Sequence, residues 1–298
     1  MDPTTQWHPV GVPGVKIGHW SEYSALTGCT VIEFPEGTIA SCEVRGGAPA
    51  SRELDVLDPG KTVTQVEAAL LTGGSAFGLA AADGVMKYLE EQGRGVVTPA
   101  GKVPIVPALG LFDLGLGDPA VRPDRDSGYQ AALNARAGEV VTGLIGAGTG
   151  ACASQWRGPQ ERHRAGLVYA EHRVGDVVVG ALCAVNAFGD VINGREPVGF
   201  ASAAVFDAAF IQVPPRSHTT IGVVFTNALL DKVGCRIVAE GAHDGLARAV
   251  HPPHTRFDGD AFIAAATGVV PAPVDTVRML ATAAVTDAIR SAVRQHGR

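Results

Sequence analysis

The chain has 298 residues, of which 46% are hydrophobic and 18% charged, the balance of a folded protein with a large interior. Its net charge of −6, without a dense run of Lys and Arg, excludes nucleic acid as an expected partner. No uninterrupted apolar stretch of about 18 residues and no signal-like start occur, so neither a membrane span nor secretion is expected. Five widely spaced cysteines without a C-x-x-C pair favour reduced thiols in a cytoplasm.

Short apolar runs alternate with helical patterns along the chain, which predicts one α/β domain over residues 1–298 with much β pairing. Ser75 is expected to N-cap the first long helix, which Gly93 would end. A turn around Gly175 and Asp176 is expected to join two strands in a hairpin. The predicted strands span residues 63–71, 140–145, 167–170, 177–185 and 221–225. The two C-terminal helices are predicted over residues 230–250 and 274–294.

Two glycine-rich turns could bind a ligand. Residues 144–151 match the looser G-x-G-x-x-A dinucleotide pattern, and Glu171 lies about 20 residues further on, where a ribose-binding acid belongs. Residues 156–159 would break the crossover helix too early, however, so a turn lining a pocket is favoured, with Gly148 as a candidate pocket residue. Residues 73–75 could hold an anion at a helix start, although tight strand-to-helix packing is the favoured interpretation.

Three histidines near one another in sequence, His243, His251 and His254, could in principle ligate a metal. They do not form an H-E-x-x-H pattern, and two of them flank a Pro-Pro corner, so ordinary histidines at a helix end are favoured and no metal is expected. The chain also lacks the G-x-S-x-G elbow of an α/β-hydrolase.

Two further features carry hydroxyl and carboxyl groups. Thr219 and Thr220 stand between a polar loop, 214–218, and an apolar run, and strand propensity alone would explain them. Asp258 and Asp260 flank a glycine, and a solvated turn alone would explain them.

Taken together with other segments, these features carry a family resemblance. The segments, in chain order, are VKIGH at 15–19, VRGGAP at 44–49, LTGGSAFGL at 71–79, GAGTG at 146–150, VNAFG at 185–189, TTIGVV at 219–224 and FDGD at 257–260. The chain resembles the DmpA-like family of self-processing hydrolases, which includes β-aminopeptidases and endo-type nylon-oligomer hydrolases. The resemblance implies a layered α-β-β-α sandwich of the N-terminal-nucleophile-hydrolase type.

The resemblance also implies that the chain cuts itself between His218 and Thr219, giving fragments 1–218 and 219–298. Thr219 would then become an N-terminal residue whose hydroxyl is the nucleophile. A free α-amine has an unperturbed pKa near 8, so it can serve as the base for its own hydroxyl. The loop before the cut would have to be exposed.

Other roles follow from the resemblance position by position. Asn186 would donate to the developing oxyanion. Asp258 and Asp260 would orient the nucleophile and hold its amine, and their two-residue spacing would point both carboxylates the same way in an extended segment. The Asp-Gly-Asp motif favours the nylon-hydrolase branch, since the β-aminopeptidase branch has a serine and a glutamate at these positions.

The chain departs from the family pattern at three places. His218 stands where relatives commonly carry Asn or Gly before the cut. Gln155 and Arg157 lie in a segment where relatives often have a lysine, and Arg differs from Lys in geometry. Phe112 stands where some relatives have a tyrosine. These last three side chains, with Thr220 and Gly148, are the candidate substrate-pocket residues.

The resemblance predicts an amide hydrolase for short linear amides, either N-terminal aminoacyl peptides or oligomers of the 6-aminohexanoate type. It implies no metal or organic cofactor, and it implies a homotetramer of cleaved protomers. Two alternatives stay open: an acyltransferase of the ornithine-acetyltransferase type, and an uncut family member without catalytic activity.

Overall fold

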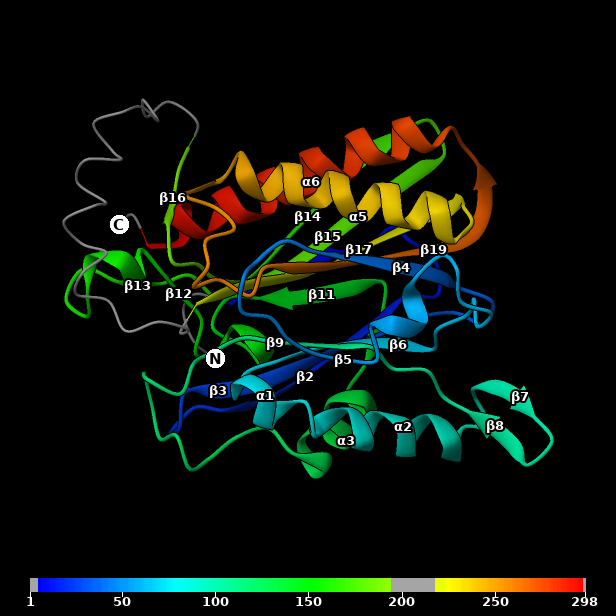
Figure 1. Ribbon diagram of the computed structural model, residues 1–298, viewed down its shortest axis with the longest axis horizontal. Coiled ribbons are helices and arrows are strands. Elements are labelled where there is room, and N and C mark those ends of the chain that lie inside the picture. The colour runs from blue at the N-terminus through cyan, green and yellow to red at the C-terminus, as the bar shows by residue number, and fades with distance from the viewer. Residues whose placement is uncertain (1–4, 194–217, 297–298) are drawn as a thin grey trace.

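The computed structural model describes residues 5–193 and 218–296, which form two stacked β-sheets between two layers of helices (Figure 1). Of the loop 214–218, which was expected to be exposed, residues 214–217 lie outside the described residues, and His218 is buried. No helix in the described part of the chain is both long and apolar enough to cross a membrane.

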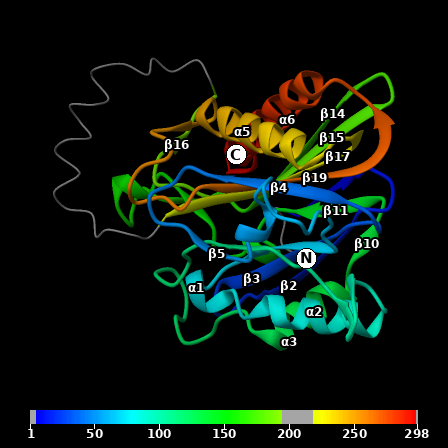
Figure 2. The same ribbon diagram turned by 45° about the vertical axis from the view of Figure 1, so that its right-hand side comes forward.

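The first sheet has five strands in the order β14-β15-β17-β19-β4. Their bounds are Leu167–Val174 for β14, Val177–Asn186 for β15, Thr219–Leu229 for β17, Ala261–Pro271 for β19 and Ile39–Val44 for β4. Neighbours run antiparallel except β17 and β19, which are parallel. Parallel neighbours need a crossover, and helix α5 (Lys232–Ala247) supplies it on the outer face beside α6 (Val274–His296) (Figure 2).

The second sheet has six strands in the order β10-β2-β3-β6-β9-β5, and helices α2 (Ala81–Glu91) and α3 (Arg125–Leu133) cover its outer face. Its strands span Arg136–Ala137 (β10), Lys16–Glu22 (β2), Thr27–Glu33 (β3), Ala68–Thr72 (β6), Ala108–Gly110 (β9) and Ala50–Arg52 (β5). Four two-stranded pairs complete the sheets: Gln6–Pro9 (β1) with Glu139–Thr142 (β11), Val96–Thr98 (β7) with Gly101–Val103 (β8), Cys152–Ala153 (β12) with His163–Arg164 (β13), and Asp190–Val191 (β16) with Val250–His251 (β18). The described residues also form α1 (Ser75–Gly78) and the 3₁₀ segments Asp55–Leu57, Gly146–Gly148 and Gln155–Arg157.

Three buried apolar clusters hold these four layers together. One fills the space between the sheets, one lies between the first sheet and α5 with α6, and one lies between the second sheet and α2 with α3. Burial of apolar surface is the dominant favourable contribution to folding, so each interface stabilises the stack. The predicted α-β-β-α layering is confirmed.

Strand β17 shows how this packing aims side chains. Ile221, Val223 and Phe225 belong to the cluster between the sheets, whereas Val224 belongs to the cluster under the helices. Because side chains alternate along a strand, Thr219 faces the space between the sheets and Thr220 faces the helices.

Most predicted elements lie within a few residues of the observed ones, including the β14–β15 hairpin and both C-terminal helices. The helix expected from Ser75 to Gly93 is wrong in two respects. Gly74, in the left-handed region at φ 77°, occupies the N-cap position, and Ser75 is the first helical residue. The helix is also split after Gly78, because the next turn is tightened by 3₁₀-type bonds such as Ala80 N–H to Phe77 O, 3.2 Å.

Candidate active site

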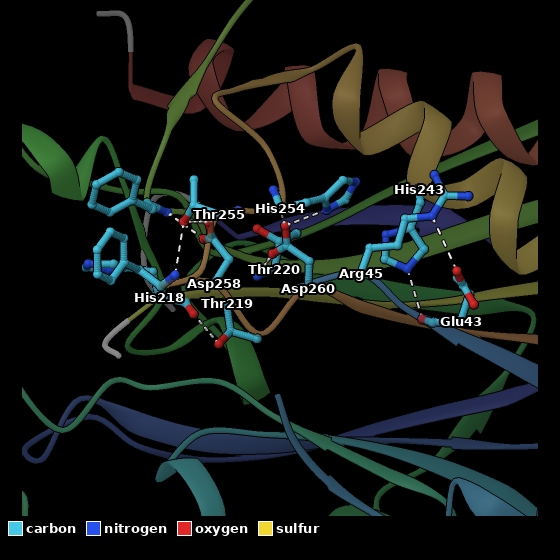
Figure 3. A network of polar contacts seen from close by, with 12 residues as sticks. Glu43, Arg45, His218, Thr219, Thr220, His243, His254, Thr255, Asp258 and Asp260 are labelled. Atoms are coloured by element: carbon cyan, nitrogen blue, oxygen red, sulfur yellow. Dashed lines mark hydrogen bonds and ion pairs between the residues drawn. The ribbon is translucent and has the colours of Figure 1, made fainter. Parts of the chain in front are cut away.

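Thr219 begins β17 directly opposite Asn186, the last residue of β15. Leu182 and Ala184 of β15 face the space between the sheets, so alternation places Asn186 on the same side as Thr219. The Thr219 hydroxyl donates a hydrogen bond to the carbonyl oxygen of His218 (Figure 3). The predicted nucleophile therefore lies against the carbonyl group of the bond predicted to be cut.

Gly259 supplies a second donor to that same carbonyl oxygen. Its backbone N–H lies 3.0 Å from His218 O, and His218 pairs with Asp258 in a parallel β-bridge. A Cβ at position 259 would lie 2.7 Å from Ala48 O and 2.8 Å from Thr219 Oγ1, so only glycine fits without a shift. This donor was not predicted from the sequence, although a glycine between two carboxylates was a visible sign of it.

Asp258 is buried, with 2% of its surface exposed, and each of its oxygens accepts hydrogen bonds. Oδ1 accepts from Phe188 N–H at 3.1 Å, and Oδ2 accepts from Thr255 N–H at 3.0 Å and from the Thr255 hydroxyl at 2.5 Å. Burial and then the nearby Asp260 charge raise the pKa of Asp258 well above its ordinary value.

Asp260 links the nucleophile's strand to the loop before β19. Its Oδ1 accepts from Thr220 N–H at 2.8 Å, and its Oδ2 lies 3.1 Å from His254 N and 2.9 Å from His254 Nδ1. Figure 3 shows both carboxyl groups on the helix side of β17, opposite the Thr219 hydroxyl. The common direction expected for the pair is observed. Among the described residues, the hydrogen-bond partners of the two carboxylates are backbone amides, the Thr255 hydroxyl and the His254 ring, and the Thr219 hydroxyl is not one of them.

Asn186 is hydrogen-bonded to β12, to the 3₁₀ segment that follows it and to the loop at Phe112. Its Oδ1 accepts from Cys152 N–H at 3.1 Å and from Gln155 Nε2 at 2.9 Å, and its Nδ2 donates to Phe112 O at 2.9 Å. An amide nitrogen carries two hydrogens, and one is used in these contacts. Phe112 and Gln155, both predicted pocket residues, thus lie beside Asn186.

The other predicted pocket residues lie elsewhere. Thr220 is fully buried on the helix side of β17, which separates it from the Thr219 hydroxyl. Arg157 donates from Nε to Oδ1 of Asp190 at 2.9 Å and from Nη2 to Oδ2 at 2.7 Å, so its charge is already paired. Gly148 packs against β14, where a Cβ would lie 2.1 Å from Leu167 N.

His218, the departure before the bond to be cut, is buried beside aromatic rings. Its ring lies 5.1 Å from that of Phe188, which lies 5.5 Å from that of Phe257. Burial lowers the pKa of His218 to about 4, so this ring is neutral at neutral pH.

The alternative ligand sites are accounted for by internal contacts. The anion position at residues 73–75 is filled by the Asp113 carboxylate, whose Oδ1 accepts from Gly74 N–H at 2.7 Å. His243 and His254 have ring centroids 4.9 Å apart, whereas His251 lies in β18 opposite Asp190. No group of three or more metal-ligating side chains occurs among the residues that the structure describes. All five cysteines are buried with raised thiol pKa values, which makes them poor nucleophiles.

Comparison with known sequences identifies one family. The model of peptidase family S58 matches residues 10–296. An uncharacterized aminopeptidase of Mycobacterium tuberculosis (strain ATCC 25618 / H37Rv) is 40% identical, with 88% of this chain and 82% of that protein covered. A 6-aminohexanoate-oligomer endohydrolase of Paenarthrobacter ureafaciens is 31% identical, with 88% of this chain and 75% of that protein covered.

Solved structures show the same fold. A Burkholderia sp. beta-aminopeptidase superposes with a TM-score of 0.71 at 23% identity, covering 95% of this chain and 85% of that one. The L-aminopeptidase D-Ala-esterase/amidase of Ochrobactrum anthropi, described as a variant of the Ntn-hydrolase fold, has a TM-score of 0.71 at 18% identity over the same shares.

Proposed function

The chain belongs to peptidase family S58, and from that membership we propose that it is a self-processing hydrolase of peptide or amide bonds with Thr219 as its nucleophile. One observation carries the proposal: the Thr219 hydroxyl and the Gly259 N–H both donate to the carbonyl oxygen of His218. A nucleophile and a backbone donor thus converge on the single peptide bond that self-processing requires to be cut.

Self-cleavage follows from this arrangement in two steps. Thr219 Oγ1 attacks the carbonyl carbon of His218, and the Gly259 N–H stabilises the negative charge that develops on the oxygen. The C–N bond then breaks, the proton lost by the hydroxyl passes to the nitrogen of Thr219, and an ester joins His218 to the hydroxyl oxygen. Water hydrolyses this ester, which leaves a carboxylate on His218 and a free amine and hydroxyl on Thr219.

Turnover of a substrate repeats the chemistry with the new N-terminus. The free amine of Thr219 takes the hydroxyl proton while the oxygen attacks a substrate amide carbonyl. The Asn186 amide donates to the developing oxyanion from across the ladder, and Asp258 with Asp260 orients the strand that carries the nucleophile. The amine of the substrate leaves with the proton that the Thr219 amine took up, and water hydrolyses the acyl ester on Thr219. This chemistry uses no metal or organic cofactor.

The substrate class is inferred from the relatives. The two sets of relatives are named aminopeptidases and 6-aminohexanoate-oligomer endohydrolases, so short linear amides are the common chemistry. The Asp-Gly-Asp spelling favoured the second set, whereas the aminopeptidases are the more similar in overall sequence. We therefore include both N-terminal aminoacyl amides and linear 6-aminohexanoate oligomers in the proposal, together with a cytoplasmic homotetramer of cleaved protomers.

Denaturing mass spectrometry of the purified protein tests the proposal. We expect two fragments that separate between residues 218 and 219, and hydrolysis of aminoacyl amides or 6-aminohexanoate oligomers by the cut protein. An intact chain with no amidase activity after long incubation would assign an uncut, non-catalytic protein. Preferential transfer of the acyl group to an added amine, in place of water, would assign an acyltransferase.

Gly259→Ala is expected to slow self-cleavage by about 10-fold to 100-fold, because the added Cβ would displace the donor from His218 O and crowd Thr219 Oγ1. The rate can be followed by the loss of intact chain on a denaturing gel. Gly115→Ala is the matched control, since a Cβ there meets only Phe112 at 4.0 Å. Equal rates in the two variants would remove Gly259 from the mechanism.

A further inference from the structure

His254 holds an unusual backbone conformation beside the carboxylate pair. Its φ is 53°, in the left-handed region that few residues other than glycine adopt. Such a conformation persists only where the surroundings enforce it, and it is often found at functional sites. Here the backbone N–H and ring Nδ1 of His254 both lie within hydrogen-bond distance of one oxygen, Oδ2 of Asp260, at 3.1 and 2.9 Å.

A second histidine supports the ring of His254 from α5. His243 is fully buried, and its ring lies 4.9 Å from that of His254 and 5.0 Å from that of Phe262. His243 Nε2 lies 2.9 Å from the carbonyl oxygen of Glu43 in β4, and because a carbonyl only accepts, Nε2 carries the proton. Figure 3 shows the row from Glu43 through His243 and His254 to Asp260.

The backbone of Asp260, the last residue of the row that begins at Glu43, is also held by hydrogen bonds. Its carbonyl oxygen accepts from Arg45 N–H at 3.0 Å and from Gly46 N–H at 3.1 Å. The side chain therefore has one remaining freedom, rotation about its own bonds, and His254 removes that freedom by holding Oδ2. Oδ1 is then aimed at the N–H of Thr220, 2.8 Å away.

We propose that His254 is a positioning residue: its Nδ1–H donates to Asp260, which holds the Thr220 N–H and thereby fixes Thr219 against the bond to be cut. This inference rests on the proposed role of Thr219. It adds a residue to the site that the family resemblance and the sequence pattern left among ordinary histidines.

The charges around His254 fit a donor role. The titratable groups that face it are Asp260 and Asp258 from the loop before β19, His243 from α5, and Glu43 with Arg45 from the end of β4. Burial lowers the pKa of His243 to about 4, so that ring stays neutral. The ring beside Asp260 is that of His254. An N–H donated by this ring offsets the repulsion between the two buried carboxylates.

A matched pair of variants tests this role. Glycine and asparagine both tolerate the left-handed backbone, but only asparagine keeps an N–H near the position of Nδ1. We expect His254→Gly to cut itself about 10-fold to 100-fold more slowly than the parent chain, and His254→Asn to stay within about 5-fold of it. Thermal unfolding of each variant separates a positioning effect from a loss of folding.

The pH profile of self-cleavage gives a readout that loss of packing alone would not move. Without this donor the Asp260 charge acts uncompensated on Asp258 and raises the pKa of Asp258 further, so His254→Gly should shift the acidic limb of the rate profile to higher pH. His254→Asn should leave that limb in place. His172→Asn is the control, because His172 contacts Asp287 at the same 2.9 Å on the exposed surface.

Nitrogen NMR of the imidazole ring detects the contact between His254 and Asp260 independently of any activity assay. In the uncut Thr219→Ala chain, His254 should carry a proton on Nδ1, and Asp260→Asn should alter that signal. An Nδ1 without a proton would overturn the positioning role. Equal rates and pH profiles for the parent chain and both His254 variants would overturn it as well. Failure of the proposed function shows differently, as self-cleavage or turnover that persists in Thr219→Ala.

Discussion

Thr219→Ala is expected to leave the chain intact and to lower amide hydrolysis by at least about 10⁴-fold, because it removes the hydroxyl that forms the ester intermediate in the proposed mechanism. The Thr219 hydroxyl donates a hydrogen bond to the carbonyl oxygen of His218. Removing it also removes the nucleophile of the mature enzyme, so processing and turnover should be lost together. Denaturing mass spectrometry measures the first effect and an amidase assay measures the second.

Two neighbouring substitutions make this result specific. Thr219→Ser keeps a hydroxyl and should still cut, whereas Thr220→Ala removes a buried hydroxyl on the helix side of the strand and should cut near the parent rate. Self-cleavage in Thr219→Ala, with its loss in Thr220→Ala, would transfer the nucleophile to Thr220. The alternation of β17 argues against that outcome, because it aims the two hydroxyls at opposite faces.

The regular part of this fold was predictable because its signals are local. Strand and helix periodicities placed β15, β17, α5 and α6 within a few residues, and these elements carry both Asn186 and Thr219. The resemblance supplied the candidate residues, and the ladder then showed that Thr219 and Asn186 are direct partners. Pairing register depends on contacts far apart in sequence, which a local pattern does not encode.

The irregular part of the site was not predictable for the same reason. His254 lies in a left-handed turn, and the residue behind it, His243, reaches a carbonyl 200 positions away in the chain, that of Glu43. Periodicity says nothing about such a turn. Likewise, residues 73–75 were expected to serve tight packing, with a bound anion as the less favoured interpretation, and the group found there is the internal carboxylate of Asp113, which only the folded chain brings to this position.

The carboxylate pair was predictable in its direction but not in its hydrogen-bond partners. The spacing of Asp258 and Asp260 gave them a common direction, as observed, but the partners of that direction are the N–H groups of Phe188 and Thr220. In the proposed mechanism, their role in self-cleavage is to fix the backbone on both sides of the pairing between β15 and β17 before the cut. A donor in place of either carboxylate should disturb that backbone directly.

Asp260→Asn is the substitution that should show this most clearly, with self-cleavage slowed by about 100-fold or more. Three donors converge on this carboxylate: the N–H groups of Thr220 and His254 and the His254 ring. An amide presents an NH₂ group to one side, so in either orientation a donor faces a donor. The rate of loss of intact chain, measured across pH, checks the result.

The pH dependence of the residual cleavage gives the sign of the electrostatic coupling. The charge on Asp260 contributes to the raised pKa of Asp258, so its removal should lower that pKa and move the acidic limb to lower pH. This is the opposite of the shift expected for His254→Gly, so the two variants discriminate charge removal from donor removal. Asp287→Asn, on an exposed carboxylate that also contacts a histidine at 2.9 Å, should change neither rate nor profile. An Asp260→Asn chain that cuts at the parent rate would mean that the buried pair stabilises the fold and takes no part in the cut.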